Sequence, residues 1–158
     1  MKLRSMTSLY LLSGDRLILL RRNSGIAKDL YVAAAGGHFE ESELCSPEVC
    51  VLREAKEELG LEKEDIAGLA LRYIALKYAN GEIRQNYYFF GRISPEKAAG
   101  LVSNEGELVA LSPEKAPDLP APFCPPFVLR HWLEIGRYDT RLYGGAATAD
   151  GLEFSPMY

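Results

Sequence analysis

Glu54, Glu57 and Glu58 form a carboxylate cluster that limits how the segment around them can fold. They are spaced i, i+3 and i+4, so on a helix the three carboxylates share one face. Leu52 and Leu59 fall on roughly the opposite face and can pack against a core. Like charges at this spacing repel, so helix stability gives no reason to gather them. A solvated acidic face is one interpretation, and a site for a hard cation such as Mg²⁺ is the other.

The residues on either side of the cluster predict a helix over 47–59. Ser46 offers a capping hydroxyl, and the ring of Pro47 is preset for the first turn. Gly60 is a stop signal at the other end. Arg53 precedes Glu57 by four residues, so the sequence also predicts an ion pair that holds one carboxylate.

The chain just before this helix adds a glycine pair and an acidic loop. Read together, the segment 36–61 is GGHFEESELCSPEVCVLREAKEELGL. It resembles the Nudix box, G-x5-E-x7-R-E-U-x-E-E-x-G-U, in which U is aliphatic. Gly37 is followed after five residues by Glu43, and residues 53–61 fill the second half of the pattern.

The segment departs from this pattern between its two halves. Nine residues, rather than seven, separate Glu43 from Arg53, as though two had been inserted around Leu44-Cys45. A longer surface loop costs little free energy. We therefore expect the insertion to bulge before Ser46, to leave Ser46 as the helix cap and to leave the helix in place.

The resemblance implies an α+β protein with the Nudix fold, an α/β/α sandwich around a mixed β-sheet. The pattern of apolar residues and turns predicts strands at 4–12, 16–22, 30–35, 69–78, 82–93 and 107–111, helices at 47–59 and 127–135, and a terminal hairpin from 141–143 and 152–154. Asn80-Gly81 is the strongest hairpin signal. We expect one Nudix domain over 1–158, with the tail 137–158 weakly covered by the resemblance.

The resemblance also implies which residues form the site. Gly37, Glu54, Glu57 and Glu58 are the expected metal ligands, and Glu54, Arg53 and Glu105 are expected to be catalytic. Glu105 is preferred to Glu107 because it precedes the strand at 107–111. Loop acids in water are the plain alternative.

Arg22 and Phe123 are the expected substrate-binding residues. An arginine suits a phosphate because its guanidinium forms a bidentate fork, and the resemblance favours Arg22 over Arg21. Phe123 lies in the proline-rich stretch 117–126 and can stack on a base. Surface arginines and core packing of the aromatic ring are the alternatives. Asn86 and Asp118 are candidate polar contacts to the base.

Composition narrows the class of protein. The net charge of −4 argues against a nucleic-acid polymer as partner, and the three cysteines have no zinc spacing. No signal peptide or membrane span is recognisable, which favours the cytoplasm. The oligomeric state is left open.

The resemblance finally implies an enzyme that acts on acid anhydrides. We expect a Mg²⁺-dependent (alternatively Mn²⁺-dependent) MutT-like hydrolase that cleaves a nucleoside triphosphate, 8-oxo-dGTP included, to nucleoside monophosphate and pyrophosphate by water attack. The alternatives are a pyrophosphatase for ADP-ribose, a nucleotide sugar or a dinucleoside polyphosphate, and a non-catalytic nucleotide-binding module.

Overall fold

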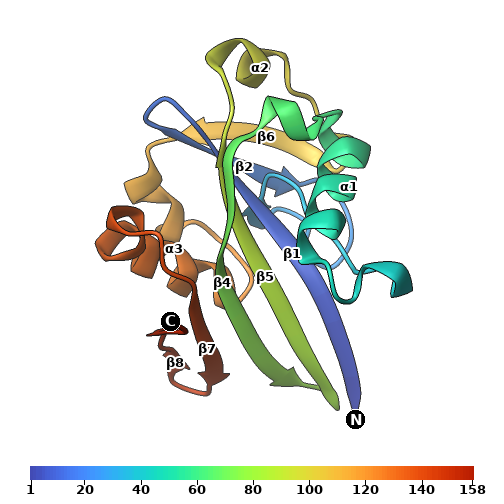
Figure 1. The fold of residues 1–158 in the computed structure, drawn as a ribbon, viewed down its shortest axis with the longest axis vertical. Coiled ribbons are helices and arrows are strands. Elements are labelled where there is room, and N and C mark those ends of the chain that lie inside the picture. The colour runs from blue at the N-terminus through green and yellow to red at the C-terminus, as the bar shows by residue number, and fades with distance from the viewer.

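A twisted mixed sheet runs through the molecule with helices on both of its faces (Figure 1). The computed structural model describes residues 1–158. The strands are β1 (Lys2–Ser13), β2 (Arg16–Arg22), β3 (Tyr31–Ala33), β4 (Ala67–Ala79), β5 (Glu82–Arg92), β6 (Gly106–Leu111), β7 (Tyr143–Thr148), β8 (Gly151–Leu152) and β9 (Ser155–Pro156). The α-helices are α1 (Pro47–Leu59), α2 (Pro95–Gly100) and α3 (Cys124–Glu134).

The sheet combines short hairpins with two parallel pairings between distant strands. Its order is β3-β2-β1-β5-β4-β7-β8, with β6 beside β2 and β9 beside β7. β4 and β5 form an antiparallel hairpin at Asn80-Gly81, where both residues have positive φ. β1 pairs in parallel with β5 over eleven residue pairs, from Lys2↔Glu82 to Leu12↔Arg92. β1 is therefore a central strand, and Leu9 through Leu12 are all buried.

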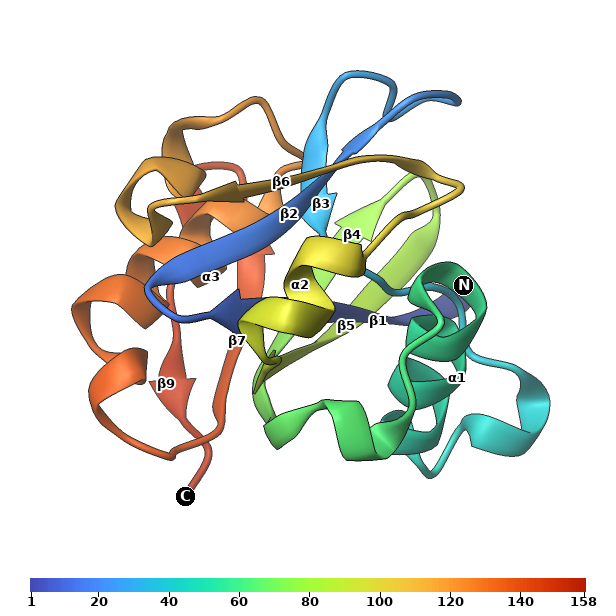
Figure 2. The ribbon, with the colours of Figure 1, turned by 90° about the horizontal axis from the view of Figure 1, so that it is seen from above.

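Each face of the sheet has its own hydrophobic core (Figure 2). On one face Val51 and Ala55 of α1 join the cluster that contains Phe89. On the other face Trp132 of α3 stacks on Phe90, with 5.1 Å between ring centroids. The three layers confirm the sandwich with a mixed sheet that the sequence predicts.

Most expected elements are present, and the differences have local causes. The α1 helix spans the predicted residues, and β2 has the predicted bounds. The predicted start of the late helix at 127 was wrong, because α3 begins at Cys124. Pro125 and Pro126 occupy its first turn, where a helix needs no amide donors. The short helix α2 was not predicted.

The tail is tied to the sheet more extensively than the expected hairpin. β7 pairs with β8, and it also joins the edge of β4 in parallel. Arg72 of β4 is buried and donates to the carbonyls of Gly136 (2.6 Å) and Arg141 (2.9 Å) and to the carboxylate of Asp139 (2.9 Å). One guanidinium thus anchors the loop between α3 and β7.

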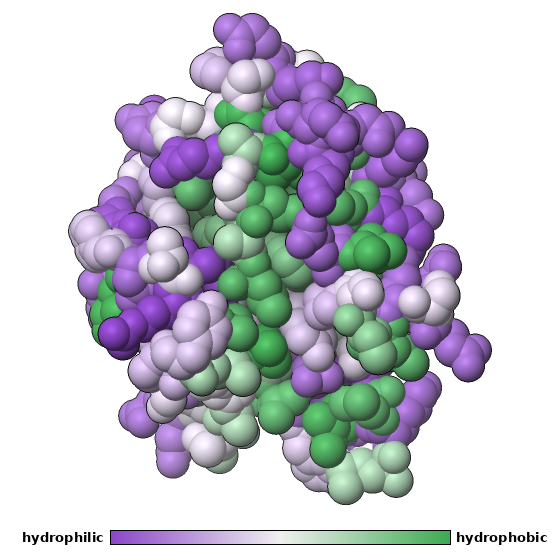
Figure 3. Space-filling view, viewed as in Figure 1, coloured by the Kyte–Doolittle hydropathy of each residue, from purple (hydrophilic) through white to green (hydrophobic).

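The surface divides by polarity. In the view of Figure 3, hydrophilic residues gather over α1, whereas a band of hydrophobic residues follows β4 and β5. Leu76 and Tyr78 of β4 are among the exposed apolar side chains. None of the helices combines the length and the apolar character needed to cross a membrane.

Candidate active site

The glycine pair after β3 allows the chain to pass very close to β1 and α1. The Thr7 amide donates to the Gly37 carbonyl at 2.9 Å. A Cβ atom at Gly36 would overlap the backbone of Thr7, and one at Gly37 would overlap the carboxylate of Glu54. Gly36 therefore requires glycine, and a side chain at Gly37 would displace the Glu54 carboxylate, beside which the pair places the loop.

Arg53 is the centre of an ion-pair network among the acidic residues. Its guanidinium donates to Glu43 at 2.6 and 3.1 Å, to Glu54 at 2.8 Å and to Glu57 at 3.1 Å. It also donates to the carbonyl of His38 at 3.0 Å. The predicted pair between Arg53 and Glu57 is confirmed, and Arg53 positions three carboxylates at once.

Glu43 is the buried member of this network, with only 3% of its surface exposed. The hydrogen bonds from Arg53 lower the pKa of Glu43 to about 2, although burial acts in the opposite direction. The Glu40 amide also donates to this carboxylate, at 2.9 Å. Glu43 therefore stays ionised and closes the loop onto α1.

The two-residue insertion changes the loop and leaves the helix in place, as predicted. Residues Glu41–Glu43 form one 3₁₀ turn, and Leu44 and Cys45 are exposed before α1 begins at Pro47. Ser46 is the cap residue, but its hydroxyl makes no capping hydrogen bond, so that detail of the prediction was wrong. Its ψ of 72° is far from the extended value that a side-chain cap favours.

Glu58 lies on the inner side of α1, beside the glycine pair. Its carboxylate accepts the Gly36 amide at 3.4 Å. Burial raises the pKa of Glu58, and the negative charges of Glu54 and Glu105 raise it further. Three carboxylates from α1 and from the loop before β6 thus approach one another.

Carboxylate oxygens are suitable ligands for a hard cation, but in this structure the carboxylates do not surround one common point. No three carboxylate, imidazole or thiol side chains converge on one point. Glu57 instead faces Arg53, and its side chain is 58% exposed. Glu54 and Glu58 supply carboxylate oxygens, which are the donor type that Mg²⁺ prefers.

Arg22 and Glu105 meet across the gap between β2 and β6. Their side chains lie 3.4 Å apart, and the Nε of Arg22 is buried without a hydrogen-bond partner. Arg21, its neighbour on β2, pairs instead with Asp29 at 3.1 Å. Alternation along β2 therefore places Arg22, and not Arg21, on the side of Glu58.

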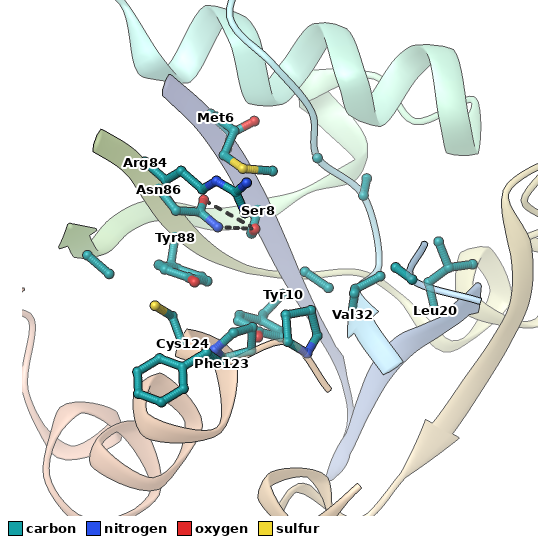
Figure 4. A pocket seen from close by; sticks show the side chains of 18 of the residues that line it. Met6, Ser8, Tyr10, Leu20, Val32, Arg84, Asn86, Tyr88, Phe123 and Cys124 are labelled. Carbon is teal, nitrogen blue, oxygen red and sulfur yellow. Dashed lines mark hydrogen bonds between the residues drawn. The ribbon is translucent and has the colours of Figure 1, made fainter. Parts of the chain in front are cut away.

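A cavity of about 320 Å³ opens beside these residues. Glu58, Gly36 and Arg22 are among the residues that line it. Figure 4 shows that Tyr10, Tyr88, Leu20 and Val32 form much of its wall, with Ser8, Asn86 and Arg84 gathered at a polar end. Its size and mixed lining are typical of a small-molecule site.

Phe123 lines this cavity, as does Asn86, whereas Asp118 does not. Phe127 and Lys77 hold the Phe123 ring: the ring centroids are 5.2 Å apart, and the ammonium lies 4.5 Å from the Phe123 centroid. Asp118 is largely exposed and lies 3.7 Å from Arg130. The interpretation of Asp118 as a base contact was therefore wrong.

Two basic residues of the cavity, Lys77 and Arg84, were not identified from the sequence. They are direct partners across the β4–β5 hairpin. The signal was present, because a two-residue turn at Asn80-Gly81 fixes the register and puts position 77 opposite position 84. Neither residue has a carboxylate within hydrogen-bonding geometry that would explain the pair.

Comparison with known proteins gives one family and many similar structures. A family model described as "NUDIX domain" matches residues 2–127. A mutator MutT protein from Bacillus halodurans has a TM-score of 0.68 at 21% identity, covering 98% of this chain and 95% of that one. The ORF135 protein of E. coli has a TM-score of 0.69 at 22% identity, covering 87% and 94%.

A third solved structure, a C. elegans Ap4A hydrolase complex, has a TM-score of 0.66 at 16% identity, covering 86% of this chain and 99% of that one. Comparison with curated proteins gives no match. At these identities the likeness to solved structures is a likeness of fold.

Proposed function

The chain belongs to the Nudix family, and from this premise we propose that it hydrolyses a diphosphate linkage of a nucleoside triphosphate to give nucleoside monophosphate and pyrophosphate. The observation that carries this proposal is the position of the cavity. Glu58 and Arg22 line it together with an apolar wall that includes Tyr10, Tyr88 and Val32. A charged polyphosphate and a flat base need two such regions side by side.

Glu54, Glu57, Glu58 and the carbonyl of Gly37 are the proposed ligands of Mg²⁺, or of Mn²⁺. When bound, the cation would offset the charge of the diphosphate and make a water molecule more acidic. Glu57 must first leave Arg53, and an exposed ion pair of this kind is worth about 1 kcal/mol or less. The approach of a cation can therefore redirect Glu57 at little cost.

Residues of the chain itself are proposed to orient the substrate and accept a proton. Arg22 is positioned to bind a phosphate, and its unpaired Nε adds a donor for that purpose. Arg53 positions Glu54 and Glu57. Glu54 and Glu105 are the proposed acceptors for a proton from the attacking water.

Water is a better nucleophile here than any side chain of the cavity. Ser8 is hydrogen-bonded to Asn86 and has no partner base. Cys124 lines the cavity, but burial raises the pKa of its thiol, so little of the reactive thiolate is present at neutral pH. A covalent intermediate on either residue is disfavoured.

A substrate panel tests the proposal. Initial rates with Mg²⁺ would be measured for the common nucleoside triphosphates, 8-oxo-dGTP, ADP-ribose, a nucleotide sugar and diadenosine tetraphosphate (Ap4A). We expect pyrophosphate from a triphosphate at the highest kcat/KM. A higher kcat/KM for ADP-ribose would overturn the assignment of a triphosphate as substrate, but the protein would still be a hydrolase. A lack of turnover with every substrate would favour a non-catalytic nucleotide-binding module.

A further inference from the structure

Lys77 and Arg84 are two cations facing each other on neighbouring strands at the wall of the cavity. Like charges directly opposite in a sheet are destabilising. Lys77 lies over the Phe123 ring, which gives it a structural contact of its own. The Arg84 Nε is buried and has no hydrogen-bond partner, although a carboxylate oxygen of Glu82 lies 3.5 Å away. The wall thus presents at least one strong donor that no protein group satisfies.

The surroundings of this donor favour a flat ring over a phosphate. Tyr10, Tyr88, Val32 and Ala75 line the adjacent cavity, and the part of a phosphate that faced them would lose its hydration. A flat ring with apolar faces suits these walls. Its edge would then meet the polar end of the cavity.

The polar end offers mainly hydrogen-bond donors. Ser8 and Asn86 bond each other in two contacts of 3.1 and 3.3 Å, which use the Ser8 hydroxyl proton, one Asn86 amide proton and one lone pair on each oxygen (Figure 4). Arg84 lies next to them and can only donate. The one carboxylate of the cavity, Glu58, accepts the Gly36 amide at 3.4 Å. A ring edge that carries acceptors is therefore the complement.

We propose that Arg84, supported by Lys77, selects nucleobases that present a keto oxygen, such as guanine, hypoxanthine, uracil and thymine, over bases with an amino group at that position. The inference rests on the proposed function and specifies its substrate. Arginine and lysine pair readily with the O6 and N7 acceptors of guanine. An exocyclic amino group would instead point a donor at a donor and leave both unpaired.

Two matched pairs of substrates test this directly. ITP and ATP differ in the keto or amino group at position 6, and UTP and CTP differ in the same way at position 4. The kcat/KM of the full-length protein with Mg²⁺ is expected to favour the keto member of each pair by about tenfold or more, the size expected for a hydrogen bond to a charged group.

Substitutions of Arg84 test whether this residue causes the preference for keto bases. R84M is expected to bring both ratios close to one, and R84K to give intermediate ratios. R92M is the matched control, because Arg92 lies on the same strand, outside this cavity, and donates to the Gly14 carbonyl at 3.2 Å. R92M is expected to keep the wild-type ratios.

Calorimetric binding of IMP against AMP, and of UMP against CMP, without metal separates this inference from the proposed function. A keto preference in binding that R84M removes supports the inference even if no triphosphate is hydrolysed. The inference is overturned if the wild type shows no preference for the keto member or prefers the amino member. It is also overturned if R84M keeps the wild-type ratios of keto to amino members. The inference is also overturned if UDP-glucuronate binds more tightly than UDP-glucose, by a larger factor than separates the keto and amino nucleotides, and if R84M abolishes that difference. Lys77 and Arg84 would then bind an anion.

Discussion

Replacing Glu43 by glutamine tests whether the buried ion pair with Arg53 holds the loop onto α1. The substitution keeps the shape of the side chain and removes its charge. Glu43 is almost fully buried, and it accepts two hydrogen bonds from Arg53 and one from the Glu40 amide. The ion pair is therefore poorly screened by water, and its loss should be measurable as a change in stability.

The pKa of Glu43 gives the magnitude. It falls from 4.5 to about 2, and at about 1.4 kcal/mol per pKa unit this difference corresponds to about 3 kcal/mol. Glutamine keeps one acceptor oxygen, so we expect Glu43→Gln to lower the free energy of unfolding by about 2–3 kcal/mol. For a domain of this size, that is a fall of about 4–12 °C in Tm.

The pH dependence has a definite sign. The folded-state pKa is lower than the unfolded-state value, so the stabilisation is complete above pH 4.5 and is lost as the pH falls toward 2. Urea unfolding of wild type and Glu43→Gln from pH 7 to pH 2.5 would measure this. The stability difference between the two proteins is expected to be constant near neutrality and to shrink below about pH 4.5.

Glu41→Gln is the matched control, because Glu41 lies in the same 3₁₀ turn and is exposed. It should change stability by no more than about 0.5 kcal/mol. A Glu43→Gln effect as small as this control at pH 7, or one that does not vary with pH, would refute the reasoning.

Two further substitutions test the metal site. Glu57→Gln and Glu58→Gln should each lower kcat by about tenfold or more with an unchanged circular dichroism spectrum, because each removes charge needed to hold Mg²⁺; wild-type kcat in both would show that the ligands are misassigned. Gly37→Ala should lower kcat similarly, since its methyl group would displace the Glu54 carboxylate. Gly100→Ala, at a position with open space around it, should leave kcat unchanged.

The parts of the site that depend on local spacing could be predicted from the sequence. A helix from Pro47 to Leu59 fixes which glutamates share a face, and the Asn80-Gly81 turn fixes which residues of β4 and β5 are opposite each other. Neither inference needs knowledge of the rest of the fold. The order of strands and helices also followed from local patterns, through the resemblance to the Nudix family.

The cavity could not be predicted in this way, because it depends on contacts between distant segments. Its walls come from all of the first five strands, from α1 and from the segment at the start of α3, and no periodicity shows which of their side chains face one another. The burial of Glu43 was equally hidden, since the two-residue insertion breaks the spacing that would have placed it beside Arg53. The first turn of α3 was misread because its prolines look like a loop.

The long parallel pairing of β1 with β5 has a consequence for how the protein forms during synthesis. β1 can meet β2 as soon as both have left the ribosome, but its partner β5 follows about 80 residues later in the chain. Until then, one edge of a strand that is buried in the folded protein has no partner. Pairings over such separations form slowly and leave apolar strands exposed meanwhile. The nascent chain must therefore carry the β5-facing edge of β1 unpaired until more than half of it has been made.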